Sequence, residues 1–176
     1  MKKILIPLLL VCFAFISIQT SAQKMSKTFS FGFGLESALP LGDAGEAFSF
    51  APGLTLRASY KVGPGFATLT SGGLIFIPKK VDADNLQISL QIPVKAGYKF
   101  IYKDHFFAMG EIGFSNFKTY YKDLDDNVAS ISQSGVTFAP TIGYQAGTFE
   151  IGLRYEHVGF KNGSLSTAGL RLGFNF

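Results

Sequence analysis

The fold is decided by residues 86–100, which read LQISLQIPVKAGYKF. Every even position from Leu86 to Phe100 is apolar or aromatic, whereas the odd positions are polar residues, glycine or proline. Side chains on a β-strand point alternately to its two faces, so a period of two places the apolar residues together. The stretch therefore predicts a strand with one apolar face and one polar face.

Seven further segments show the same alternation, at residues 28–36, 51–61, 66–77, 105–117, 135–146, 149–157 and 165–176. The segment 66–77 is the least regular, because residues 74–77 are apolar on both faces and Gly72 and Gly73 interrupt it. Its length and its flanks still suit a strand. We therefore expect eight strands, an even number.

The connections between these strands alternate in length. They are long at 37–50, 78–85, 118–134 and 158–164, and short at 62–65, at 101–104 and around Gly147. Bacterial outer-membrane barrels have long extracellular loops and short periplasmic turns. We expect both termini on the periplasmic side and four loops on the outside of the cell outer membrane.

A soluble eight-stranded barrel with an inward apolar face is the main alternative. The polar faces favour a membrane barrel, because they are rich in glycine and serine and carry a few charges of both signs, as a narrow lumen requires. We predict an all-β protein, an eight-stranded antiparallel up-and-down transmembrane β-barrel. The charges predicted to form a lumen network, which would either plug the barrel or line a very narrow conduit, are Glu36, Arg57, Lys95, Glu111, Glu150, Arg154, Glu156 and Arg171.

Residues 1–22 have the layout of a cleaved signal peptide: two lysines, an apolar run, and small residues before Gln23. Residues 23–176 then form one barrel domain. The only cysteine, Cys12, lies inside the apolar run, so the mature part has neither a disulfide nor a thiol. Removing Lys2 and Lys3 lowers the net charge from +4 to about +2, and no basic block remains to indicate nucleic-acid binding.

Aromatic residues gather near the predicted short turns, where a girdle at the membrane boundary would lie. Aromatic β-propensity alone could account for some of them. They are Tyr60, Tyr98, Phe100, Tyr102, Phe106, Tyr144, Phe149, Phe174 and Phe176. A second group in or beside the long connections, interpreted either as exposed contact residues or as an outer girdle, is Phe48, Phe50, Phe117, Tyr120 and Tyr121.

Three features carry a resemblance to a known family: the junction at residues 21–23, the run LQIPVKAGYKF at 90–100, and the closing strand AGLRLGFNF at 168–176. With them the mature chain resembles the porin-like outer-membrane β-barrel family of Bacteroidota, akin in size to OmpX-type and OmpA-type barrels. The resemblance implies contact with outer-membrane lipid, and Phe174 and Phe176 are similar to the signal read by the barrel-assembly machinery. It does not imply an activity.

Few residues could carry catalytic or metal chemistry. The one candidate catalytic cluster is His157 with Glu156 and Ser164 or Ser166, and no Gly-x-Ser-x-Gly motif supports it. Acidic segments at 82–85 and 123–127 could hold calcium, but neither matches an EF-hand loop. We predict no enzyme activity, no cofactor and no metal site.

The function predicted from the sequence is a structural or interaction scaffold. We expect loops 37–50 and 118–134 to form the contact surface for an extracellular ligand, and the protein to be a monomer. The alternative is a narrow pore or transporter for small solutes, and a lipid A-modifying enzyme is the least favoured interpretation.

Overall fold

The computed structural model describes residues 28–79, 88–122 and 128–176. The predicted signal peptide, residues 1–22, and the acidic segments 82–85 and 123–127 lie outside these ranges, so those interpretations stay predictions. Within the described ranges, no helix has the length and apolar character needed to cross a membrane.

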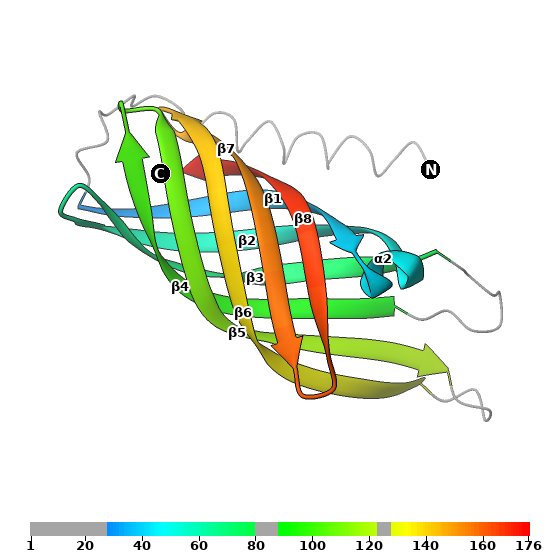
Figure 1. Ribbon diagram of the computed structural model, residues 1–176. Coiled ribbons are helices and arrows are strands. Elements are labelled where there is room, and N and C mark those ends of the chain that lie inside the picture. The colour runs from blue at the N-terminus through cyan, green and yellow to red at the C-terminus, as the bar shows by residue number, and fades with distance from the viewer. Residues whose placement is uncertain (1–27, 80–87, 123–127) are drawn as a thin grey trace, which may run out of the picture.

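Eight antiparallel strands form one closed barrel in which each strand pairs with its neighbours in the chain and β8 returns to β1 (Figure 1). This confirms the predicted fold class. The elements are β1 Phe29–Leu41, α2 Asp43–Ala47, β2 Phe48–Val62, β3 Gly65–Pro78, β4 Ile88–Tyr102, β5 Phe106–Lys122, β6 Val128–Ala146, β7 Phe149–Phe160 and β8 Gly163–Asn175.

The two ends of the described chain complete the barrel. Glu36 of β1 lies opposite Arg171 of β8 in an unbroken register of ten residue pairs. Beyond it, the backbone N–H of Phe176 donates to the carbonyl of Phe31 at 2.7 Å, and the N–H of Phe31 donates back at 3.2 Å. Closure leaves no free sheet edge between β1 and β8.

The alternating residues sort by polarity in the direction predicted for a membrane barrel. Apolar side chains point outward and are widely exposed, among them Phe31 at 62%, Leu153 at 61% and Ile142 at 64%. Charged side chains point inward, where Arg171 is fully buried. A lipocalin-like barrel would have the opposite arrangement.

Both predicted contact loops are largely strand or helix in their described residues, so their predicted extent was wrong. In the range 37–50, β1 continues to Leu41, α2 follows, and β2 begins at Phe48. In the range 118–134, β5 and β6 remain paired as far as Lys122 and Val128. Periodicity missed these extensions because the apolar alternation ends where one face is no longer buried, whereas backbone pairing continues without it.

The predicted loop 158–164 is also shorter than expected, since β7 and β8 stay paired up to Phe160 and Gly163. Only Lys161 and Asn162 form the turn. The connection between β7 and β8 is therefore a tight hairpin.

The β5–β6 hairpin is the longest in the barrel and extends well beyond the neighbouring strands at the loop end (Figure 1). Its outward face changes character along its length: Phe114 and Val136 are apolar and exposed, but Asn116 and its neighbours across the ladder, Ser132 and Ser134, are polar. Asn116 donates to both serines, at 2.8 and 3.0 Å. We name residues 116–122 and 128–134 the β5–β6 ribbon.

The aromatic residues near the short turns form a band around that end of the barrel. Phe106 stacks edge-on against Tyr144 at 5.4 Å between ring centroids, and Phe149 against Phe174 at 5.7 Å. The hydroxyl of Tyr98 donates to the carbonyl of Val62 at 2.8 Å. Amphipathic rings of this kind are typical of a membrane–water boundary.

Candidate functional site

The inward face of the barrel holds a network of ion pairs, and its layer nearest the short turns is built around Glu150 of β7. Arg57 and Arg171 each donate from Nη1 to the same oxygen, Oε1, at 2.7 Å. The other oxygen, Oε2, accepts from the amine of Lys99 and from Asn175 at 3.3 Å. One buried carboxylate therefore joins strands β2, β4, β7 and β8.

The middle layer is centred on Arg154, which lies two inward-facing positions after Glu150 along β7. Its Nη1 donates to Oε1 of Glu36 at 3.0 Å, and its Nη2 donates to Oε2 of Glu111 at 3.2 Å. Glu36 also lies 3.2 Å from Nε of Arg171, and Glu111 accepts from Thr70 at 2.5 Å. Arg154 thus connects β7 to β1 and β5 across the interior.

The third layer is centred on Glu156, the next inward position of β7. Its carboxylate forms an ion pair with Lys95 of β4 and accepts from Nε2 of Gln91 at 2.7 Å. Gln91 also donates to Ser115 at 2.9 Å. All three layers are explained by the period of two along β7, which places positions 150, 154 and 156 on one face.

The structure thus places all eight predicted lumen charges in the interior. Ion pairs join six of them, Glu36, Arg57, Glu111, Glu150, Arg154 and Arg171, in one network, and Lys95 and Glu156 pair with each other. The structure adds Lys99, whose amine donates to Glu150 and Gln145 and lies 4.3 Å from the centre of the Phe107 ring. The sequence contained the signal for Lys99, because this residue is four positions after Lys95 and so shares its face. Among the described residues, five buried cations face four buried carboxylates.

An apolar layer that the sequence analysis missed lies inside the barrel towards the loop end. Phe76 is fully buried, with Phe48 at 5.5 Å and Phe117 at 5.2 Å between ring centroids. Phe48 and Phe117 were expected in or beside exposed loops, and this was wrong because β2 and β5 carry them into the interior. The buried members of the layer are Ala38, Ala51, Leu74, Phe76, Val158 and Leu165.

The predicted catalytic cluster is divided between the two faces of the wall. Glu156 points into the lumen, whereas His157, the next residue, points outward and has Nδ1 2.9 Å from the hydroxyl of Ser166. Consecutive strand residues face opposite sides, so the carboxylate cannot orient this imidazole. His105 lies at a short turn at the other end of the barrel, where its Nδ1 is 3.1 Å from the Lys103 carbonyl.

The two residues of the predicted assembly signal lie at the end of β8. Phe174 faces outward and packs against Phe149, and Phe176 is 57% exposed beside β1. Both rings are therefore on the outer face of the closing strand. Their recognition by the assembly machinery stays a prediction.

Solved structures share this fold at low sequence identity. The crystal structure of Ail, the attachment invasion locus protein of Yersinia pestis, is 15% identical with a TM-score of 0.60, over 84% of this chain and 96% of Ail. The N-terminal barrel domain of Pseudomonas aeruginosa OprF is 13% identical with a TM-score of 0.62, over 84% and 97%. Neisserial surface protein A is 13% identical with a TM-score of 0.56, over 85% and 96%.

No curated protein matches the sequence. The model of one family, described as the outer membrane protein beta-barrel domain, matches residues 8–176. That range contains every strand of the barrel and all the lumen charges described above. Together with the outward apolar wall, the match places the protein in the outer membrane, and the chain belongs to the outer membrane protein beta-barrel domain family.

Proposed function

We propose that this protein is a non-conducting outer-membrane scaffold that presents the β5–β6 ribbon and the β1–α2–β2 connection to a partner outside the cell. The observation that carries the proposal is the filled lumen. Three layers of ion pairs and one apolar layer follow one another along the barrel interior, so the wall encloses side chains instead of a solute path.

The ion-pair layers oppose conduction because several of their charged side chains have more than one ion-pair partner. Removing Glu150 from its position would leave Arg57, Arg171 and Lys99 buried without their shared carboxylate. Breaking one partner from a buried pair costs about 3–5 kcal/mol. A spontaneous opening of the network for solute passage is therefore unfavourable.

The β5–β6 ribbon supports the contact role because, beyond Phe117, its side chains at 118–121 and 129–134 are partly or fully exposed on both faces. Ile131 is 54% exposed although it lies on the same strand face as the inward residues Gly135 and Thr137. On the outward face, the Lys118 amine lies 4.9 Å from the centre of the Tyr120 ring. A hydrogen-bonded ribbon with exposed polar and aromatic side chains suits recognition of a partner.

The charged residues at the loop end indicate which class of partner is disfavoured. The connections at the loop end carry more carboxylates than lysines, which disfavours a polyanion. By sequence, the lysines are Lys79, Lys80, Lys118, Lys122 and Lys161, and the acidic residues are Asp43, Glu46, Asp82, Asp84, Asp123, Asp125 and Asp126. Ail has been solved with the heparin analogue sucrose octasulfate. We propose a neutral or basic partner for this chain instead.

Conductance in a planar bilayer tests the proposal against the narrow-pore alternative. The refolded mature chain should give no discrete current steps under conditions in which an open porin, refolded in the same way, gives them. Reproducible steps from the mature chain would establish the pore and overturn the scaffold.

Binding of sucrose octasulfate tests the partner chemistry. We expect no saturable binding by titration calorimetry to the refolded chain, with Ail as the positive control. Saturable binding that is lost in a Lys118→Gln variant would contradict the exclusion of polyanions and identify the ribbon as a polyanion site.

The divided arrangement of Glu156 and His157 weighs against a lipid A-modifying enzyme, and we propose no catalytic role. This proposal also keeps four expectations from the sequence: a monomeric state, contact with the barrel-assembly machinery, a signal peptide and a relationship to Bacteroidota proteins. The conductance measurement tests none of them.

A further inference from the structure

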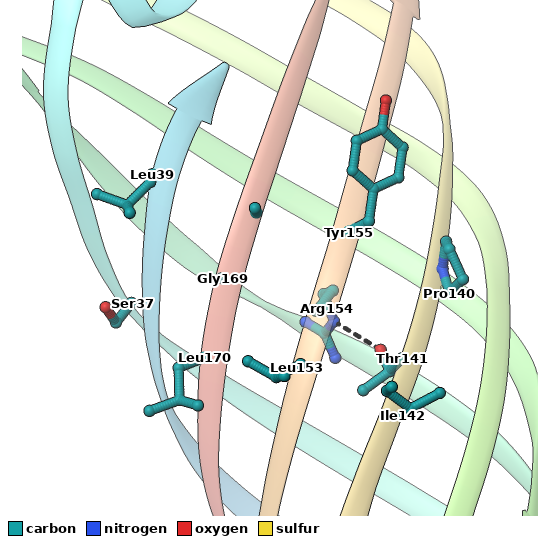
Figure 2. Close-up of a pocket in the computed structure, with 11 residues that line it drawn as sticks. Ser37, Leu39, Pro140, Thr141, Ile142, Leu153, Arg154, Tyr155, Gly169 and Leu170 are labelled. Carbon is teal, nitrogen blue, oxygen red and sulfur yellow. Dashed lines mark hydrogen bonds between the residues drawn. The ribbon is translucent and has the colours of Figure 1, made fainter.

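A depression of about 590 Å³ lies in the outer wall of the barrel, where β6, β7, β8 and β1 run side by side (Figure 2). Leu153 and Ile142 line it at one level and Leu39 and Tyr155 line it closer to the loop end. The small residues Ser37, Ala168 and Gly169 also line it. Thr141 and Arg154, which are joined by a hydrogen bond, complete the lining on the inner side (Figure 2).

The depression has a cause in the sequence of β6. Pro140 lines it and has no backbone N–H, so it cannot donate to the β6–β7 ladder. The residue pairs of that ladder accordingly stop at Phe138 and resume at Thr141. A local loss of strand pairing beside small side chains leaves the wall recessed.

The recess faces the hydrocarbon of the membrane. Leu39, Ile142 and Leu153, at its edges, are 56%, 64% and 61% exposed. Water is absent from the bilayer core, and an empty void there would forfeit dispersion contacts. The occupant of the recess must therefore be a hydrocarbon chain.

A polar cluster lies on the same outer surface, directly on the loop side of the recess. The hydroxyl of Tyr155, which lines the recess, is 3.2 Å from the hydroxyl of Ser166, and Ser166 is 2.9 Å from Nδ1 of His157. The exposed Lys161 follows in the β7–β8 turn. A lysine and an imidazole beside hydroxyl groups favour an anionic oxygen such as a phosphate.

We infer that one lipid A molecule of the outer leaflet binds to this wall. One of its acyl chains occupies the recess between β6 and β1, and a phosphate of its headgroup contacts Lys161 and His157. The α2 connection and the extended β5–β6 hairpin lie at this end of the barrel, and outer-membrane barrels carry their larger extensions on the extracellular side. Lipid A is the phosphorylated lipid of that leaflet. The site lies on the β6–β1 wall, apart from the β5–β6 ribbon, and does not depend on its role.

The test is lipid retention measured by native mass spectrometry after the refolded mature chain is mixed with lipid A or with phosphatidylglycerol in detergent. Wild-type protein should retain lipid A in preference to phosphatidylglycerol. Ala168→Phe fills the recess and should lower retention about tenfold, since a change of 1.4 kcal/mol corresponds to that factor. Ala96→Phe, at an exposed outward position of β4, is the matched control and should retain lipid A normally.

Lys161→Glu tests the headgroup contact and should lower retention while leaving the barrel heat-modifiable on gels. If Ala168→Phe does not fold, Ser37→Phe fills the same recess from β1. Equal retention by the filled variants and the wild type would overturn the site. Equal retention of phosphatidylglycerol and lipid A would overturn the assignment to lipid A.

Discussion

Arg154 of β7 donates to Glu36 of β1 at 3.0 Å across the barrel interior, although 118 residues separate them in the chain. Both side chains are buried, and neither strand is adjacent to the other in the sheet. The contact therefore forms only when the barrel closes. This ion pair stabilises the closed barrel in addition to the hydrogen bonds of the β1–β8 ladder.

Glu150→Gln should destabilise the barrel strongly. The amide cannot balance the charges of Arg57, Arg171 and Lys99, and removing one partner of a buried pair costs about 3–5 kcal/mol. The free energy of unfolding in urea, followed by gel mobility without boiling, measures the loss. Glu46→Gln, at an exposed position of α2, is the control and should change stability by less than about 0.5 kcal/mol.

Lys99→Met should cost less than Glu150→Gln. Glu150 would keep both guanidinium partners, and the surplus of one buried cation would disappear. The methionine side chain would also keep contact with the Phe107 ring. If urea unfolding showed a loss as large as that of Glu150→Gln, the amine of Lys99 would be essential to the network instead.

Gly113→Ala and Gly110→Ala should differ although both lie on β5. A Cβ at Gly113 would lie 2.0 Å from the carbonyl oxygen of Val94, whereas a Cβ at Gly110 would meet no atom within 4 Å. Crowding of this kind typically costs about 1–3 kcal/mol. Thermal unfolding in detergent should therefore show a lower midpoint for Gly113→Ala only, and equal midpoints would contradict the close approach of β4 and β5.

Replacing residues 119–131 by Asn-Gly should leave the barrel stable. The two-residue turn would connect Lys118 to Ser132, which are already opposite each other, and Asn-Gly is suited to such hairpins. Because the removed residues 119–121 and 129–131 are partly or fully exposed, the urea midpoint should stay within experimental error. A large loss of stability would show that the ribbon also holds the lumen closed.

Phe176→Ala should leave refolding in detergent unchanged but lower the amount of barrel assembled in cells. The backbone bonds between Phe176 and Phe31 do not need the ring, so refolding into detergent should proceed normally. If the terminal aromatic is read by the assembly machinery, the amount of barrel in the outer membrane of cells should fall. Normal amounts in cells would show that the ring is not part of the signal.

Particular residues show how much of the fold could be predicted from the sequence alone. The alternation from Leu86 to Phe100 was enough to predict a strand, its two faces and the inward position of Lys95. The same period also contained Lys99, because a face is determined by parity alone. The inward charges, the number of strands and their antiparallel order followed from such local patterns.

Only the tertiary structure decided which of these residues meet. Parity places Glu150 and Arg57 on inward faces, but the distance between them depends on the stagger of eight strands around the barrel, to which every register contributes. The position of Phe117 inside the lumen and the recess beside Pro140 arise in the same way. Alternation is a property of one strand, whereas packing across the interior is a property of all of them.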